Sequence, residues 1–307
     1  MQKLIDFDSE YLKKIFPPLL ADKTTGGNIV WATNAYLDYG YGQEDQITQS
    51  SIYGEGAIIL HPRAQKSQED QLSRTRSKAE VFTPSWLCNE MNNFADTEWF
   101  GRENVFNTLN EDHAWVVTTD KIVFPEEKTW KDYVLSRRLE ITCGEAPYLV
   151  SRYDTVSGEL IPELQNRIGM LDRKLRIVNE NTKTESNWLN WATKAFQSSY
   201  GYEFQGDSLL IARINMFMTF IDYYKERWNK EPEDKILEDI ADIISWNVWQ
   251  MDGFTDTVPF GKIKEPQNEQ LMLFDFEDEK EEYLTNPCII RDWKDNKTVA
   301  YKDLKKS

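Results

Sequence analysis

Two strand-to-helix signatures in the middle of the chain constrain its fold more than any other feature. They occupy residues 139–149 and 200–216. In the first, Leu139 and Ile141 are expected to close a buried strand with Glu140 at its tip, and a tight turn leads to Pro147, which suits the first turn of a helix. Units of this kind build open α/β folds, in which ligands bind at the carboxyl ends of parallel strands, so the strand ends Glu140 and Glu203 are expected to lie side by side and frame one crevice.

The remaining pattern alternates in the same way. Helical periodicity predicts helices over 158–176, 186–198 and 207–228, and a further helix starts at Asp234. This last helix leads into the apolar run IISWNVWQMDG, which is typical of a strand buried on both faces. The order favours a mostly parallel sheet with helices on both faces.

The first half of the chain is less regular. A short helix is predicted over 10–15, ended by Pro17 and Pro18, and strand-like runs at 30–33 and 57–60 follow. A hairpin is expected within 114–124. Thr83 can cap a helix whose apolar residues recur at helical spacing, namely Trp86, Leu87, Met91 and Phe94.

Charge limits the possible partners. The 307 residues include 52 acidic and 36 basic ones, so the formal charge of −16 opposes general attraction to nucleic acid. One basic stretch reverses this locally between residues 63 and 78. This stretch is either a solvated linker or an arm that touches DNA phosphates. In the second case the contacts would be made by Arg63, Lys66, Arg74, Arg76 and Lys78.

Several classes of protein are excluded. Three widely separated cysteines without CxxC spacing, and a start without a signal-peptide pattern, predict a reduced cytoplasmic setting. No apolar run approaches the ~20 residues of a membrane-spanning helix. The two histidines, His61 and His113, lie outside any ligand-spaced cluster, which argues against a metal site or a histidine triad.

Four motifs resemble those of the adenine-N6 DNA methyltransferases of restriction-modification systems. AEVFTP is similar to the leading GxxFTP motif of that family, and EITCGEAPYL to its DPxCGxGxFL motif. YGYEFQGDSLLIARIN resembles the next motif, and MDGF a short third one. They occur in the family's order, which is harder to obtain by chance than one match.

The resemblance implies a Rossmann-like S-adenosylmethionine-dependent methyltransferase fold, incomplete here, and methyl transfer to adenine N6 in DNA. It implies that Glu140 holds the cofactor's ammonium, that Glu203 accepts hydrogen bonds from its ribose, and that Asp252 faces the adenine amine. Alternatively, Glu203 caps the following helix and Asp252 starts a turn. The remaining cofactor contacts that it implies are Phe82, Thr83, Pro84, Cys143, Gly144 and Ala146.

Two departures from the family pattern concern the chemistry. Glu145 and Ala146 replace a small residue and a glycine, which adds bulk and charge beside the expected ligand. The catalytic motif, Asn or Asp followed by two prolines and an aromatic, is matched in part only at Asn286. The alternative for this region is a terminal hairpin with strands at 288–293 and 298–302.

A short motif at 270–274, QLMLF, resembles the peptide by which bacterial proteins dock onto the replication sliding clamp. Its anchors would be Gln270, Leu271, Leu273 and Phe274, although an edge strand of the protein's own sheet fits equally well.

The sequence thus divides into an irregular N-terminal region with a basic arm (1–77), a cofactor domain (78–262), and an acidic segment with a C-terminal hairpin (263–307). Three functions remain open. The chain is a DNA adenine methyltransferase with Asn286 as amine acceptor, a non-catalytic recognition or assembly subunit of a restriction-modification system, or an acidic mimic of DNA.

Overall fold

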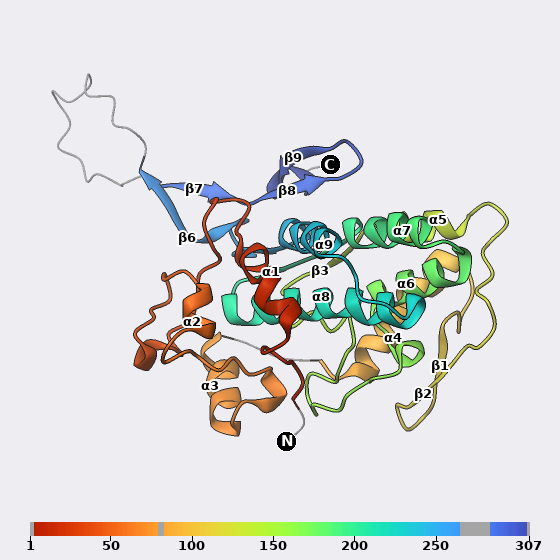
Figure 1. Cartoon of the computed structure of the whole chain (residues 1–307), viewed down its shortest axis with the longest axis horizontal. Helices are drawn as coiled ribbons and strands as arrows, with labels where there is room; N and C mark the ends of the chain where they lie inside the picture. The colour runs from red at the N-terminus through yellow and green to blue at the C-terminus, as the bar shows by residue number, and fades with distance from the viewer. Residues whose placement is uncertain (1–2, 79–82, 265–282, 306–307) are drawn as a thin grey trace.

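A three-stranded parallel sheet lies at the centre of the computed structural model, which describes residues 3–78, 83–264 and 283–305 (Figure 1). Its strands are β3 (Arg138–Glu140), β4 (Ser199–Glu203) and β5 (Val248–Gln250), in the order β3-β4-β5. Both strand pairs are parallel, and Glu140 is in register with Gly201. The predicted mixed α/β class with parallel strands is therefore confirmed, with three strands in the sheet.

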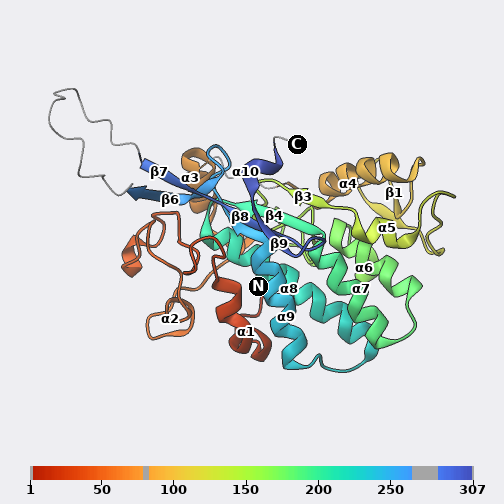
Figure 2. The same cartoon turned by 90° about the horizontal axis from the view of Figure 1, so that it is seen from above.

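One side of the sheet is covered by four helices, which lie side by side in Figure 2. They are α6 (Met170–Asn181), α7 (Glu185–Gln197), α8 (Gly206–Trp228) and α9 (Asp234–Asn247). Helix α8 is buried around most of its circumference because it packs against both β4 and β5 and against its neighbouring helices. Helices α7 and α8 begin within one residue of the predicted positions.

Two predicted boundaries in this region were wrong. Residues 158–169 are irregular, with a 3₁₀ turn η3 (Leu164–Asn166), because Gly158 and Pro162 interrupt the helical pattern before α6 starts. The apolar run at 243–253 is helical as far as Asn247, and β5 takes up only the next three residues. Periodicity cannot separate a buried helix end from a buried strand in such a run.

The N-terminal region packs onto the same core. Helix α1 (Glu10–Leu20) runs through Pro17 and Pro18, contrary to the predicted break. Its apolar face, including Leu12 and Phe16, is buried against α8 and α9, and this burial outweighs the hydrogen bonds that the prolines remove. The short elements η1 (Leu37–Tyr39) and α2 (Gln49–Tyr53) follow.

The strand-like runs at 30–33 and 57–60 form no regular strand. Val30 makes an isolated bridge with Gln46. The basic stretch, predicted as a linker or an arm, contains a 3₁₀ turn η2 (Arg63–Gln65) and helix α3 (Gln68–Lys78).

Helix α4 (Ser85–Phe100) begins two residues after Thr83, and the carboxylate of Asp154 accepts from its first N–H, where the threonine was predicted to cap. A small sheet of β1 (Asn107–Leu109) and β2 (Trp115–Val117) precedes α5 (Trp130–Leu135). The prediction of a hairpin within 114–124 was therefore wrong, because residues 115–117 pair with the earlier strand β1. None of the described residues forms a helix long and apolar enough to cross a membrane.

The other side of the sheet carries C-terminal elements. Strands β6 (Thr257–Lys264) and β7 (Tyr283–Pro287) form one hairpin, and β8 (Ile289–Asp292) and β9 (Lys297–Ala300) form the predicted terminal one, followed by α10 (Tyr301–Leu304). A second apolar cluster forms where Ile290 and Tyr301 meet Tyr200, Tyr202 and Trp249 of β4 and β5.

Candidate functional site

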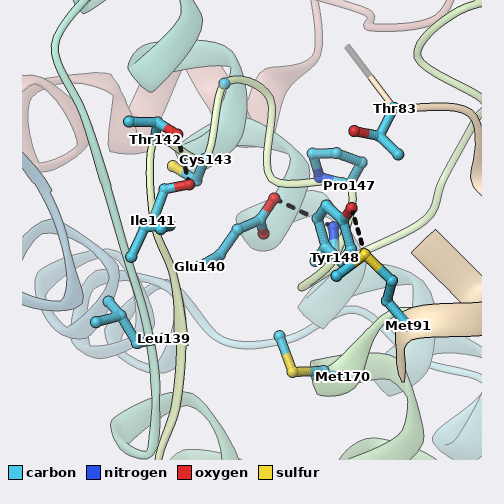
Figure 3. A pocket seen from close by; sticks show the side chains of 11 residues that line it. Thr83, Met91, Leu139, Glu140, Ile141, Thr142, Cys143, Pro147, Tyr148 and Met170 are labelled. Atoms are coloured by element: carbon cyan, nitrogen blue, oxygen red, sulfur yellow. Dashed lines mark hydrogen bonds between the residues drawn. The ribbon is translucent and has the colours of Figure 1, made fainter. Parts of the chain in front are cut away.

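A pocket of about 390 Å³ opens at the carboxyl end of β3 (Figure 3). Its walls come from four parts of the chain: β3 with the turn that follows it, the segment that begins at Pro147, the start of α6, and Thr83 with helix α4. The lining residues are Thr83, Met91, Leu139, Glu140, Ile141, Thr142, Cys143, Gly144, Pro147, Tyr148 and Met170.

Glu140 is the acidic side chain in the lining of this pocket. Its carboxylate is 6% exposed and accepts hydrogen bonds from the backbone N–H groups of Tyr148 at 3.3 Å and Leu149 at 3.0 Å. Burial raises the pKa of Glu140 to about 8, the two N–H groups oppose this shift, and the negative charge of Glu203 adds to it. A cation in the pocket would favour the ionised carboxylate, so the site is suited to a positively charged ligand.

The turn after β3 is bent tightly toward β4. Thr142, Gly144 and Ala146 have positive φ angles of 45°, 52° and 64°, and the N–H of Cys143 donates to the carbonyl of Tyr202. A left-handed conformation is costly for residues other than glycine, so surrounding contacts must hold Thr142 and Ala146 in place. Burial, and then the charges of Glu140 and Glu203, raise the pKa of the Cys143 thiol, which keeps it protonated.

Glu145, expected to crowd the ligand, points away from the pocket. Its side chain is 1% exposed and accepts from the backbone N–H of Arg63 at 2.6 Å and the hydroxyl of Tyr153 at 2.7 Å. The expectation of extra bulk beside a ligand was therefore wrong, because a buried carboxylate is drawn to hydrogen-bond donors behind the turn.

Glu203 lies at the end of β4, next to β3, but does not line the pocket. One carboxylate oxygen accepts from the N–H of Gly144 at 2.9 Å, and the other from the N–H groups of Phe204 and Gln205. Glu203 therefore ties the turn after β3 to the turn that precedes α8. Glu140 and Glu203 end adjacent parallel strands, so the two acidic strand ends lie side by side, as the sequence predicts, but Glu140 alone of the two lines the pocket.

The predicted catalytic residues, Asp252 just after β5 and Asn286 in β7, lie outside the pocket lining. Asp252 pairs with Thr257, and its carboxylate accepts from the N–H of Phe254 at 2.9 Å, as in the alternative in which it starts a turn. Asn286 belongs to β7, and the neighbouring Pro287 is in register with Thr257. Pro84 and Ala146 also lie outside the lining, and Phe82 and residues 270–274 lie outside the described residues.

The basic stretch folds back onto the start of α8. Arg74 makes a bidentate ion pair with Asp207, at 2.8 and 2.9 Å, and also donates to Gln205. Lys66 reaches Asp207 at 3.3 Å, and Arg63 donates to Thr75. Burial acts to raise the pKa of Asp207, but Lys66 and Arg74 more than offset this, so its pKa is lowered. The side chains of Arg76 and Lys78 lie outside the described residues.

Sequence reasoning missed the apolar wall of the pocket. Met91 and Met170 come from two helices, and the hydroxyl of Tyr148 lies 3.2 Å from the sulfur of Met91. Leu139 and Ile141, predicted to close a buried strand, are 41% and 62% exposed. No sequence signal marks the methionines, since apolar residues on helices usually belong to a core.

Comparison with known proteins yields no relative: no protein-family model, curated protein or solved structure matches this chain. The assignment of a function therefore rests on the pocket and on the motifs that form it.

Proposed function

We propose that the β3 pocket binds S-adenosylmethionine and that the chain is a DNA adenine methyltransferase-like protein of a restriction-modification system. The observation that carries this proposal is the convergence of two motifs. Thr83 of the leading motif lines the same cavity as Glu140, Cys143 and Gly144 of the next motif, although the two motifs are far apart in the sequence.

The pocket suits this cofactor in size and charge. Its volume of about 390 Å³ lies within the range of roughly 300–1,000 Å³ that is usual for small-molecule sites. S-adenosylmethionine carries a sulfonium and an ammonium group, and Glu140 offers a carboxylate in the wall. The bound cofactor would supply the methyl group, and adenine N6 is the acceptor implied by the motifs. The three parallel strands support a partial Rossmann-like sheet of the methyltransferase type.

Calorimetric titration with S-adenosylmethionine and its demethylated product tests the proposal. A variant Met91→Trp should weaken binding at least about tenfold, because the Met91 side chain lines the pocket and the larger ring narrows it. Phe94→Trp is the matched control, since Phe94 lies on the same helix outside the pocket lining and is 69% exposed, against 54% for Met91. Absence of heat with the folded parent protein, or equal affinity of both variants, would remove the cofactor site.

A second candidate, a non-catalytic recognition or assembly subunit, is favoured by the position of Asn286 and Asp252. Asp252 follows β5, which is two strands and thus ~10 Å from β3, and Asn286 lies in β7, outside the central sheet. Cofactor binding without methyl incorporation into duplex DNA would support this candidate. The internal ion pairs of Lys66 and Arg74 also reduce the charge that the basic stretch offers to phosphates.

A further inference from the structure

Strand β3 is an edge of the central sheet, and its outer side borders the β3 pocket, which Leu139 and Ile141 also line. Among the described residues its one strand neighbour is β4. Arg138 donates its N–H to Ser198 on the β4 side, and hydrogen-bonding groups alternate along a strand. The N–H and C=O of Leu139 therefore point away from β4, where a further strand could pair with them.

The side chains on this edge are apolar and incompletely covered. Leu139 and Ile141 project to the side of the strand opposite Glu140 (Figure 3). They extend the face on which Tyr200 and Tyr202 are buried beneath the C-terminal hairpin, yet they are 41% and 62% exposed. Strands of parallel sheets are normally covered on both faces, and the face of β3 at Leu139 and Ile141 lacks part of this cover.

A second cavity, of about 140 Å³, lies on this same face and reaches the open edge. Tyr200, Trp249 and Tyr301 give it an aromatic wall, and Leu139 forms its border with the edge. Its volume can hold a large aliphatic side chain that projects from a strand added beside β3, because alternate side chains of such a strand point toward this face.

The charge around this second cavity is opposite to that of the whole molecule. Its charged lining residues are Arg137, Arg138, Arg291 and Asp292, three cations and one anion, in a chain of formal charge −16. Arg137 is 57% exposed at the rim and reaches Asp292 at 3.2 Å, and Arg138 is paired with the buried Asp96 at 3.4 Å. Arg291 donates to a neutral partner, Asn296. A second copy of this chain would bring the same arginines to the edge, whereas an acidic segment would complement them.

We infer that β3 is the docking edge for an extended, apolar segment with acidic ends from another protein. The backbone of this segment pairs with the free side of β3, its aliphatic side chains enter the second cavity, and its carboxylates meet the arginines at the rim. This mode of recognition combines main-chain hydrogen bonds, which give affinity, with a side-chain pocket, which gives specificity.

A capped, dye-labelled peptide Glu-Asp-Ile-Thr-Val-Thr-Ile-Asp-Glu, followed by fluorescence anisotropy, tests the inference. The parent protein should bind it, and Leu139→Pro should weaken binding at least about tenfold, because proline removes the outward N–H. Leu139→Ala keeps that N–H and should retain more of the affinity than Leu139→Pro. A peptide in which lysines replace all four acidic residues should bind more weakly than the acidic one.

A second pair of variants keeps the test independent of the fold of β3. Leu304→Glu places a negative charge in the second cavity and should weaken peptide binding, whereas Leu37→Glu, at an exposed leucine remote from it, should not. The inference is overturned if the acidic peptide does not bind, if the lysine peptide binds equally well, or if Leu139→Pro leaves binding unchanged. A parent protein that dimerises in sedimentation, with Leu139→Pro monomeric, would assign the edge to a second copy instead.

Discussion

Among single residues, two carboxylates near the pocket differ in what they contact. Glu140 faces the cavity and is held by two N–H groups, whereas Glu203 holds the turn beside it through three. The burial of Glu140 makes its ionisation costly, so its protonation state links the pocket to the stability of the fold.

The raised pKa of Glu140 predicts a pH-dependent loss of stability. Because the folded-state pKa is about 8 and the ordinary pKa of a glutamate is 4.5, the folded state binds more protons between these values. The stabilisation is complete below pH 4.5 and is lost as the pH rises through 8. Denaturant unfolding at pH 5 and pH 8 should therefore show a decrease that Glu140→Gln diminishes by on the order of 2–4 kcal/mol. Equal pH dependence of parent and variant would contradict this.

At the scale of elements, helix α4 is turned with its polar residues inward. Asn89, Asn92 and Asp96 are buried, whereas Met91 and Phe94 are 54% and 69% exposed. Arg173 of α6 is 2% exposed and donates to Asp96, Asn89 and Asn93. Asn92 donates to the backbone carbonyls of Tyr148 and Ile168. A buried guanidinium needs such partners, and this requirement outweighs the burial of two apolar side chains.

Stability measurements can test this orientation. Phe94→Ser should change the free energy of unfolding by less than about 0.5 kcal/mol, because the ring is exposed. Asn89→Leu should reduce it by about 2–4 kcal/mol, since the side chains of Arg173 and Asn107 both lose a buried partner. The opposite order of the two effects would mean that the apolar residues face the core.

Helix α3 depends on one buried carboxylate. Asp207→Asn leaves Arg74 and Lys66 without their counter-charge and should lower the free energy of unfolding by about 3–5 kcal/mol. Asp234→Asn removes an exposed pair with Lys14 and should cost less than about 1 kcal/mol. Hydrogen exchange should also rise within α3 in the first variant, and unchanged exchange there would show that the ion pair does not anchor the helix.

At the scale of the whole molecule, the N-terminal region is fastened to the carboxyl ends of β4 and β5. The side chain of Gln250 exchanges two hydrogen bonds with the backbone of Val30, and the N–H of Gly206 donates to the carbonyl of Trp31. A Cβ atom at position 206 would lie 1.9 Å from the carbonyl oxygen of Val30. This close approach requires glycine.

Gly206→Ala should therefore weaken the contact between the N-terminal region and the carboxyl ends of β4 and β5. We expect a loss of at least about 1–3 kcal/mol in the free energy of unfolding, together with faster proteolysis of the segment around Val30. Gly42→Ala is the control, because its added Cβ would make only an ordinary contact, at 3.5 Å, with the side chain of Asp45. Equal stability of the two variants would show that the backbone at position 206 can move.

Local sequence patterns predicted several features of this protein. Apolar periodicity predicted α7 and α8, the strand ends at Glu140 and Glu203, and the terminal hairpin, because each depends on residues that are neighbours in the chain. It also predicted that Glu140 and Glu203 meet, since the carboxyl ends of adjacent parallel strands share one edge.

Which faces are buried and which charges are paired depends on how the whole chain packs. The continuation of α1 through two prolines, the inward polar face of α4 and the pairing of Arg74 with Asp207 each depend on residues from distant parts of the chain. The same is true of the open edge of β3, because exposure of Leu139 is set by what lies beside the sheet. Burial and ion pairing are properties of the packed molecule, and local sequence patterns do not contain them.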